Sequence, residues 1–250
     1  MIKSEIRSNT GIIILARPEK RNSLHPRMIE QLKTVLLNFE KDELVKSVII
    51  TGEGNTFCAG ADLQYLKELS EYSSLENLKD SKLLAELFLM IYEFPKPTIA
   101  AVNGAAIAGG CGLASVCDII VADIEKSKFG YSEVKIGFIP AIVSIFLIKR
   151  VGEGLANQLL FEGELISGQR AYEIGFVNYL SENVMDFALN VSEKLNKNFS
   201  VSMKMTKNML KNISNLPVRE AVDYCINLNT ISRSTNDFTK GIKTFLKKDK

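Results

Sequence analysis

Two turns built from small residues constrain the fold of this chain more than any other feature of its sequence. The first is Phe57-Cys58-Ala59-Gly60-Ala61-Asp62-Leu63, which follows a β-branched run at 48–51. The second spans residues 102–112 and follows an apolar run at 98–102. A strand, a tight turn and a helix start leave backbone N–H groups without intrahelical partners. Two such turns in one domain predict an oxyanion hole, in which two N–H groups stabilise negative charge on one carbonyl or thioester oxygen.

The balance of charges argues against a nucleic-acid-binding protein. The 31 basic and 29 acidic residues leave a net charge of +2, too little for a basic field. A solvated helix end and a phosphate contact are both open interpretations of the densest basic cluster, which is Lys243, Lys247, Lys248 and Lys250. With 250 residues, 46% of them hydrophobic, the chain is expected to form one α/β domain with a large core and a small helical appendage.

The cysteines and the single histidine show no pattern of a nucleophile or a metal site. The four cysteines, Cys58, Cys111, Cys117 and Cys225, have no CxxC or Cys/His spacing, and we expect free thiols in a reducing compartment. His25 has no visible link to the cysteines of the two turns, so neither a cysteine nucleophile nor Ser-His-Asp chemistry is expected. We place His25 in a turn or at a helix start.

Neither a membrane span nor a cofactor fingerprint is expected. The first six residues alternate like a strand and lack the apolar stretch of a signal peptide. No apolar run reaches the ~18 residues that cross a bilayer, so we expect a soluble, cytoplasmic protein without a membrane partner. The run Gly109-Gly110-Cys111-Gly112 is not a GxGxxG fingerprint, and no clustered ligands suggest a metal. We expect no cofactor and no metal.

Hydrophobic periodicity and turn residues predict alternating strands and helices. Strands are expected at 2–7, 11–16, 47–51, 98–102, 118–123 and 176–180. Helices are expected at 26–41, over most of 62–93 with a break at 70–74, near 109–117, and at 141–150, 153–161 and 168–174. From 183 to the end the pattern is helical, with breaks near 198–200 and 215–217. This alternation favours strands covered by helices over a β-sandwich.

Four motifs occur in order along the chain: FCAGADL, PKPTIAAVNGAAIAGGCGLASVCD, FGYSEVKIGFIP and GQRAYEIGFVN. With these motifs the chain resembles the crotonase family, the enoyl-CoA hydratase/isomerase group, over nearly its whole length. The resemblance implies an α/β fold: a crotonase-like spiral of ββα units over residues 1–195, with the CoA-binding and catalytic site, and a C-terminal helical trimerisation region over 196–250. It also implies an acyl-CoA thioester substrate, of which coenzyme A is a part, and a homotrimer or a hexamer made of two trimers.

The resemblance assigns catalytic roles to residues of the two turns and to one carboxylate. By position the oxyanion N–H groups fall on Ala61 and Gly109, where small residues let the backbone approach a thioester oxygen. Glu133 falls on one catalytic acid position of the family. The second acid position is Gly112 in this chain, so Glu133 has to give and take protons alone or with help from the substrate. Burial among its neighbours is expected to raise the pKa of Glu133; these neighbours are Phe129, Val134, Ile136 and Phe138.

The resemblance also implies contacts with coenzyme A from the first turn, a basic loop and the C-terminus. These residues are Lys20, Arg21, Ala59, Ala61, Asp62, Leu63, Gly109, Phe245 and Lys248. Gln64 or Lys67 stands where relatives carry a basic residue after the first turn. A second interpretation of Asp62 is that it orders the turn and does not touch substrate.

Several reactions fit this set of residues. Within the family the chain looks closest to bacterial methylglutaconyl-CoA hydratases and related branched enoyl-CoA hydratases. The first hypothesis is hydration of a branched or carboxylated enoyl-CoA through an enolate, with Glu133 as general acid/base. Alternatives are a Δ3,Δ2-enoyl-CoA isomerase, which needs one base, and an acyl-CoA decarboxylase, which needs the oxyanion hole. A non-catalytic acyl-CoA-binding or RNA-binding protein on the same fold is an alternative of another class.

Overall fold

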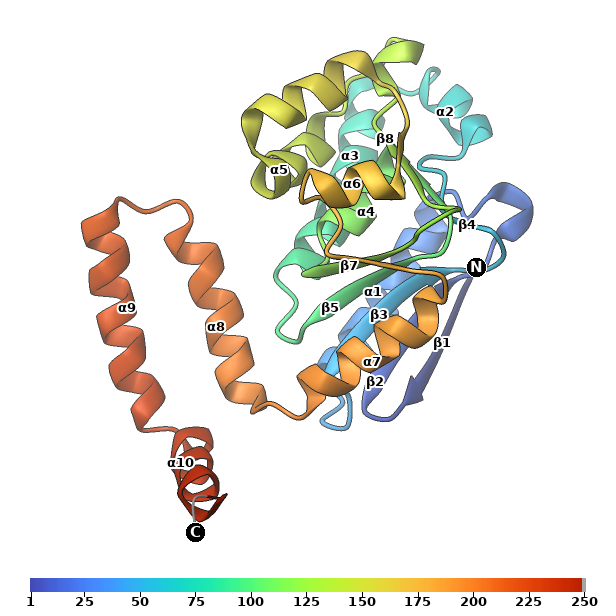
Figure 1. Cartoon of the computed structure of the whole chain (residues 1–250). Helices are drawn as coiled ribbons and strands as arrows, with labels where there is room; N and C mark the ends of the chain where they lie inside the picture. Colours follow the sequence, from blue (N-terminus) through green and yellow to red (C-terminus); the bar gives the residue numbers. More distant parts are fainter. Residues whose placement is uncertain (249–250) are drawn as a thin grey trace.

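A six-stranded sheet forms the centre of the structure (Figure 1). The computed structural model describes residues 1–248, apart from the side chains of Leu63, Lys247 and Lys248. The strands lie in the order β1 (Ile2–Arg7), β2 (Thr10–Leu15), β3 (Ser47–Gly52), β5 (Thr98–Val102), β7 (Ile119–Asp123) and β10 (Tyr179–Ser181). β1 and β2 form an antiparallel hairpin, and the later pairings in this sheet are parallel. Parallel strands covered on both faces need continuous apolar runs, which β3 and β5 supply.

Four short strands form a second sheet that the sequence patterns did not reveal. They are β4 (Thr56–Cys58), β6 (Ala105–Ile107), β8 (Lys128–Gly130) and β9 (Ile166–Ser167), in that order. β4, β6 and β8 follow β3, β5 and β7 closely, and each is followed by a helical segment, so the expected ββα unit recurs along the chain. Strands of two or three residues are too short to show a period of two, so the sequence did not reveal β6 within the second turn.

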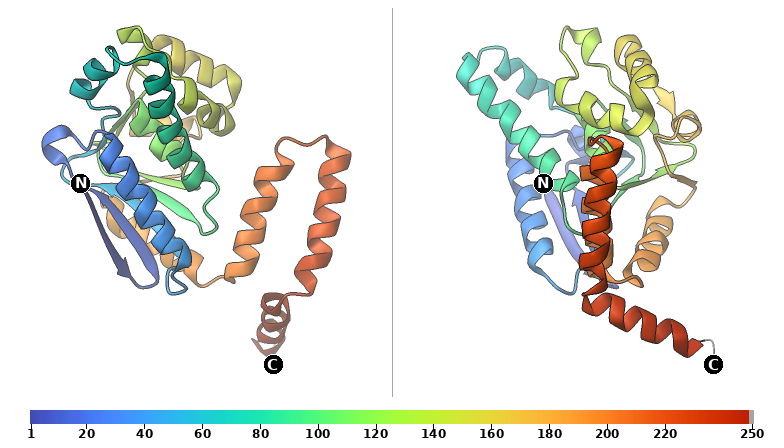
Figure 2. Two further views of the ribbon diagram at one scale, coloured as in Figure 1. Left: turned by 180° about the vertical axis from the view of Figure 1, so that it is seen from behind. Right: turned by 90° about the vertical axis from the view of Figure 1, so that its left-hand side faces the viewer.

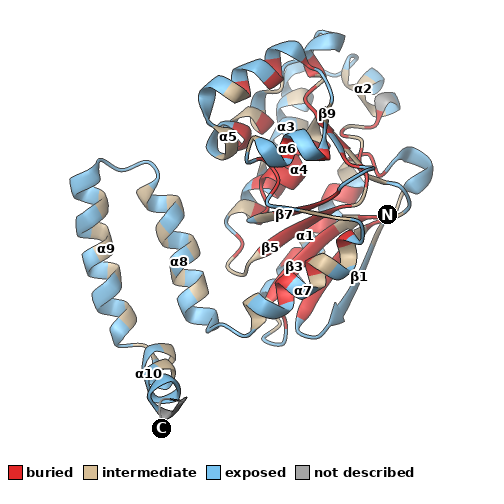
Figure 3. Ribbon diagram, viewed as in Figure 1, coloured by how far each residue is buried: buried red, intermediate tan, exposed pale blue. Residues whose placement is uncertain are grey.

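Helices cover both faces of the larger sheet (Figure 3). The main apolar core joins one set of strand residues to α1 (Pro26–Lys41), α3 (Ser74–Tyr92), α4 (Gly109–Ser115), α5 (Ala141–Glu162) and α6 (Gly168–Glu173). On the opposite face, α7 (Val184–Asn196) packs on the alternate strand residues Ile49, Ile99, Ala101 and Val121. This division follows from the period of two along a strand.

Two boundaries differ from those expected. The strand predicted at 176–180 begins only at Tyr179, because the N–H groups of Phe176 and Val177 donate to the Ala171 carbonyl and close the end of α6. The helices predicted at 141–150 and 153–161 are two parts of α5, separated at Gly152, whose φ of 77° and ψ of 166° are not helical.

Three C-terminal helices extend away from the rest of the chain (Figures 1 and 2). They are α8 (Ser200–Ile213), α9 (Val218–Arg233) and α10 (Asn236–Lys248), and α7 before them ends at Asn196, next to the expected boundary. No residue of α8 or α9 is buried. Their exposed apolar side chains include Leu210, Val218, Val222, Ile226 and Ile231. Within the described residues, no helix combines the length and apolarity that crossing a membrane requires.

Candidate active site

The two small-residue turns lie in direct contact. β4 and β6 pair in parallel, so both turns leave the same end of the smaller sheet. A Cβ at Gly60, whose φ is +80°, would lie 2.8 Å from the carbonyl oxygen of Ile107 and 3.3 Å from the nitrogen of Gly109. A Cβ at Gly110 would lie 2.0 Å from the carbonyl oxygen of Cys58. Glycine is therefore required for the two backbones to meet.

Each turn contributes one backbone N–H group without an acceptor. The N–H of Leu24 donates to the Gly60 carbonyl at 2.6 Å, and the Leu24 carbonyl accepts from the Asp62 N–H at 3.2 Å. In such a parallel bridge the N–H of the middle residue, Ala61, points away from Leu24. Gly109 is the first residue of α4, so its N–H has no intrahelical acceptor. Within residues 1–248 as described, neither N–H meets an acceptor.

A strained residue precedes Gly109. Ala108 has a φ of 49° and a ψ of −118°, values that residues with a side chain rarely adopt. Its N–H donates to the Gly130 carbonyl at 2.7 Å, and its carbonyl accepts from the Gly112 N–H at 3.0 Å. Backbone strain held in place by surrounding bonds is typical of functional sites.

Glu133 is brought to the second turn by β8. Gly130 lies opposite Ile107 in the pairing of β8 with β6, and the chain then enters the 3-10 helix η2 (Glu133–Ile136). Burial is the main cause that raises the pKa of the Cys111 thiol on α4. The charge of Glu133 lies close enough to raise that pKa further. Glu133 itself is only 7% exposed, and its Oε2 has no hydrogen-bond partner. Burial raises the pKa of Glu133, as expected, although Val134, Ile136 and Phe138, three of the four neighbours named for this burial, are themselves exposed.

The other buried carboxylates of the described chain are neutralised by partners. Asp62 Oδ2 receives the Arg17 guanidinium at 3.0 Å. Asp123 is bound by Lys126 at 3.3 Å and by two backbone N–H groups. Glu133 has no such cation among the described residues, and its Oε2 has no hydrogen-bond partner.

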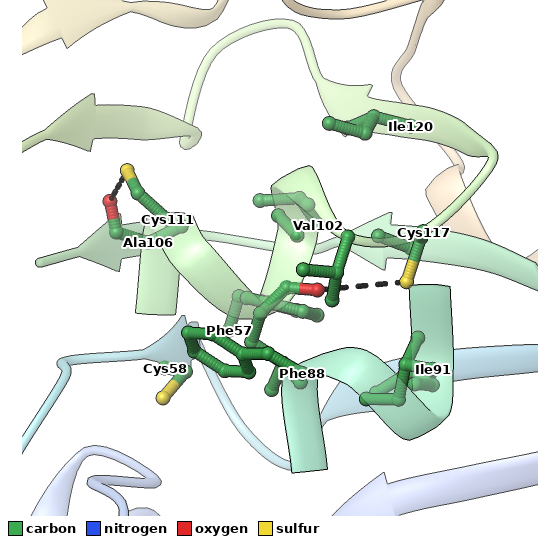
Figure 4. Packing of buried hydrophobic residues seen from close by; sticks show 14 of the residues in the cluster. Phe57, Cys58, Phe88, Ile91, Val102, Ala106, Cys111, Cys117 and Ile120 are labelled. Atoms are coloured by element: carbon green, nitrogen blue, oxygen red, sulfur yellow. Dashed lines mark hydrogen bonds between the residues drawn. The ribbon is translucent and has the colours of Figure 1, made fainter. Parts of the chain in front are cut away.

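The space beside Gly112 is filled by apolar side chains. A Cβ at Gly112 would lie 2.4 Å from Val143 Cγ1 and 2.7 Å from Phe88 Cε2. Phe88 is buried and packs edge-on against Phe146, with ring centroids 6.2 Å apart. Figure 4 shows Phe88 beside Phe57 in this core. A second carboxylate at this position would have to displace two packed side chains.

The residues expected to contact coenzyme A fall into two groups. The Ala59 N–H donates to the Arg21 carbonyl at 3.0 Å, so the basic loop with Lys20 and Arg21 lies beside the first turn. Phe245 is exposed on α10, which lies far from α2 (Leu63–Leu69) and β4 in all three views (Figures 1 and 2). The side chains of Leu63 and Lys248 lie outside those that the structure describes.

Asp62 orders the first turn. Its Oδ1 accepts the Gln64 N–H at 3.0 Å as the N-cap of α2, and its Oδ2 binds Arg17. Burial alone would raise the pKa of Asp62, but these bonds and the charge of Lys20 outweigh it and hold the pKa below its ordinary value. The sequence did not indicate Arg17 as part of the site, because its partner Asp62 is 45 residues away along the chain.

The turn cysteines are not activated. Burial raises the pKa of Cys58 to about 12 and also raises that of Cys111, whose Sγ donates to the Ala106 carbonyl at 2.8 Å (Figure 4). His25 is at a helix start, as expected: its Nδ1 accepts the Arg27 N–H at 3.2 Å and caps α1. Among the described residues, no group of three or more His, Cys, Asp or Glu side chains is placed to hold a metal ion.

Comparison with known proteins agrees with this architecture. Residues 5–250 match the family described as enoyl-CoA hydratase/isomerase. The 2,3-dehydroadipyl-CoA hydratase of Escherichia coli is 32% identical over 240 residues, which cover 95% of this chain and 92% of that protein. The mitochondrial enoyl-CoA hydratase of Pongo abelii is 34% identical over 248 residues, covering 98% and 83%. The crystal structure of an enoyl-CoA hydratase from Shewanella pealeana has a TM-score of 0.95 at 27% identity, covering 99% of this chain and 93% of that one.

The repeated ββα units and the paired turns define an enzyme of the crotonase type. The chain belongs to the enoyl-CoA hydratase/isomerase family.

The contact between the turns makes Gly110 intolerant of a side chain. Gly110→Ala is expected to lower the free energy of unfolding by about 3 kcal/mol, the upper end for overpacking, because the methyl group meets backbone that no rotamer change can move. Gly154→Ala in α5, where a Cβ meets nothing within 4 Å, is the control and should be neutral or stabilising by up to about 1 kcal/mol. Urea unfolding measures the free energy of unfolding of both variants. Equal changes in the two variants would contradict the close contact at Gly110.

The buried, unpaired carboxylate of Glu133 should lower the free energy of unfolding at neutral pH. A carboxyl group whose pKa is raised by folding favours the folded state only at low pH and opposes folding above its folded pKa. Glu133→Gln is therefore expected to raise the free energy of unfolding at pH 7–8 by on the order of 1 kcal/mol, because the amide carries no charge that burial disfavours. This gain in stability should vanish as the pH falls to 4.5, which is the ordinary pKa of a glutamate side chain. Melting curves against pH measure this, with exposed Glu182→Gln as control; a pH-independent gain would contradict it.

Proposed function

We propose that this protein hydrates an enoyl-CoA thioester, with the N–H groups of Ala61 and Gly109 as the oxyanion hole and Glu133 as the general acid and base. The observation that carries the proposal is the contact between two turns that each contribute an N–H group without an acceptor, next to the strand β8 that leads to Glu133, whose buried Oε2 has no partner. The hydratase names of the relatives support the same reaction class.

In the proposed reaction, ionised Glu133 takes a proton from a water molecule while the water oxygen forms a bond to C3. The C2=C3 electron pair moves toward the thioester, and negative charge develops on the thioester oxygen between the two N–H groups. Protonated Glu133 then returns its proton to C2, and the carbonyl is restored. Removing one oxyanion donor typically costs about 10²–10³ in rate. A raised pKa suits a group that accepts and donates a proton near neutral pH.

We extend the proposal to a branched or carboxylated acyl chain, of the methylglutaconyl-CoA kind. The resemblance of the motifs to branched enoyl-CoA hydratases supports it. The Escherichia coli relative is named for 2,3-dehydroadipyl-CoA, whose acyl chain ends in a carboxylate. Because Gly112 offers no acid, a carboxylate of the substrate is the group that would help Glu133 to orient the water.

A second candidate is isomerisation of a 3-enoyl-CoA to a 2-enoyl-CoA. The apolar filling beside Gly112, by Phe88 and Val143, favours a reaction that uses one base and no water. Glu133 would remove a proton from C2 and return it to C4, while the same oxyanion hole held the dienolate. Decarboxylation of a carboxylated acyl-CoA, which needs the oxyanion hole alone, is the third candidate.

We also propose a homotrimer, or a dimer of trimers, held by the C-terminal helices. The apolar stripe of Val218, Val222 and Ile226 on α9 recurs every four residues and is exposed in a single chain. In such an assembly Phe245 and Lys248 would contact the coenzyme A of a neighbouring copy, because α10 lies far from its own turns. Lys20 and Arg21 would contact coenzyme A in their own copy.

Oxygen labelling tests the proposed hydration. In H₂¹⁸O, the protein is expected to convert 3-methylglutaconyl-CoA, 2,3-dehydroadipyl-CoA or crotonyl-CoA to a hydroxyacyl-CoA that carries the label, as measured by mass spectrometry. Glu133→Gln should lower kcat about 10²–10⁴-fold, the usual worth of a general acid/base, while Glu182→Gln should not.

Full turnover by Glu133→Gln would exclude Glu133 as the acid/base. Absence of label from all three products would reject hydration, and 3-enoyl-CoA and carboxylated acyl-CoA substrates would then decide between isomerisation and decarboxylation.

Charge placed on the α9 stripe should separate the subunits. The wild-type protein is expected to show three or six times the 27.8 kDa of one chain in light scattering. Val222→Asp combined with Ile226→Asp should give monomers, because burying two carboxylates in an apolar interface is unfavourable. Asn227→Asp, on another face of α9, adds charge outside the stripe and should leave the assembly intact. A monomeric wild-type protein would contradict the proposal.

A further inference from the structure

The guanidinium of Arg17 joins the two chain segments that hold the Ala61 N–H. Its Nη2 lies 3.0 Å from Asp62 Oδ2, and its Nη1 donates to the Ser23 carbonyl at 3.1 Å. Ser23 directly precedes Leu24, and Asp62 directly follows Ala61. One side chain therefore connects both sides of the backbone bridge at the first turn.

The direction of the Ala61 N–H depends on that bridge. It points away from Leu24 only while Leu24 keeps its bonds to the Gly60 carbonyl and the Asp62 N–H. If the segment 60–62 tilted or slid relative to Leu24, the peptide between Gly60 and Ala61 would rotate. A hydrogen-bond donor that has rotated no longer points at the developing charge. The orientation of the Ala61 N–H would therefore control the rate of the proposed reaction.

Both members of the ion pair are themselves held firmly. Asp62 uses its other oxygen, Oδ1, to cap α2. The Arg17 N–H donates to Asn22 Oδ1 at 2.9 Å, and buried Asn22 donates from Nδ2 to the carbonyls of Glu53 and Thr56. The side chains of Arg17 and Asp62 are 11% and 9% exposed, so solvent screens their attraction little. The pair thus fastens the first turn to the connection between β3 and β4.

We propose that Arg17 and Asp62 are positioning residues that aim the Ala61 N–H at the thioester oxygen without touching the substrate themselves. This inference rests on the proposed function of Ala61 as an oxyanion donor. It also predicts that arginine is required: the planar guanidinium donates to the Asp62 carboxylate and to the Ser23 carbonyl from two different nitrogens, whereas lysine would have to reach both acceptors from a single nitrogen.

Two substitutions separate positioning from binding. Asp62→Asn keeps a side-chain oxygen that caps α2 and removes the charge. Arg17→Lys keeps the charge and removes the two separate guanidinium donors that reach Asp62 and Ser23. Each should lower kcat about 10–100-fold, the cost of a misplaced group. The Kd of free coenzyme A, which has no acyl oxygen, should change less than about twofold, since the oxyanion donors bind that oxygen alone. In infrared spectra, the carbonyl band of a bound ¹³C-labelled thioester should shift less in both variants than in the wild type.

The control is an exposed ion pair of similar length. Lys3 and Glu53 lie 2.7 Å apart with side chains 62% and 38% exposed, so Lys3→Gln should leave kcat and the carbonyl band unchanged. An unchanged kcat in a folded Arg17→Lys or Asp62→Asn, or equal losses in kcat and in affinity for free coenzyme A, would overturn the proposal. If one variant fails to fold, the other decides. Glu133→Gln, measured alongside, tests the reaction itself: its full turnover would refute the proposed function, whatever the Arg17 and Asp62 variants show.

Discussion

The contact between two backbones at the end of the smaller sheet is the constraint on which the rest of this structure depends. Parallel pairing of β4 with β6 brings two strand–turn–helix units side by side, and glycine at 60 and 110 lets them touch without intervening side chains. A wider separation would leave two ordinary helix starts. At this separation the turn that carries the Ala61 N–H touches the turn that begins α4, where the positive end of the helix dipole lies.

The same region holds several polar groups that the protein itself does not satisfy. Two N–H groups lack acceptors, Glu133 Oε2 lacks a partner, and Ala108 is strained. Each is unfavourable for folding, and elsewhere in the described chain such groups are mostly paired, as Asp62 and Asp123 are. Unpaired polar groups and backbone strain of this kind are typical of functional sites.

The long elements could be predicted from the sequence because their periodicity is local. The helix of α1 and the strands β3 and β5 lie where the apolar spacing placed them. The short strands could not, since three residues show no period, and β10 starts late because hydrogen bonds at the end of α6 use the residues before it. At the site, the sequence predicted that Glu133 is buried but not what surrounds it, since Val134, Ile136 and Phe138 are exposed. The sequence could not predict that Arg17 binds a carboxylate 45 residues away, or that Phe88 fills the space beside Gly112, because both contacts arise only from the tertiary fold.

The environments of Asp62 and Glu133 explain why one carboxylate orders the backbone and the other can do chemistry. Arg17 and two backbone segments keep Asp62 ionised, with a lowered pKa, so it has no proton to give near neutral pH. Burial without a cation raises the pKa of Glu133 and brings its two protonation states closer in energy. A lone acid/base needs that compromise, because a strong base holds its proton too tightly to return it and a strong acid does not take one from water. In the proposed reaction, Gly112 offers no second carboxylate, so burial of Glu133 does the tuning that such a group would otherwise share.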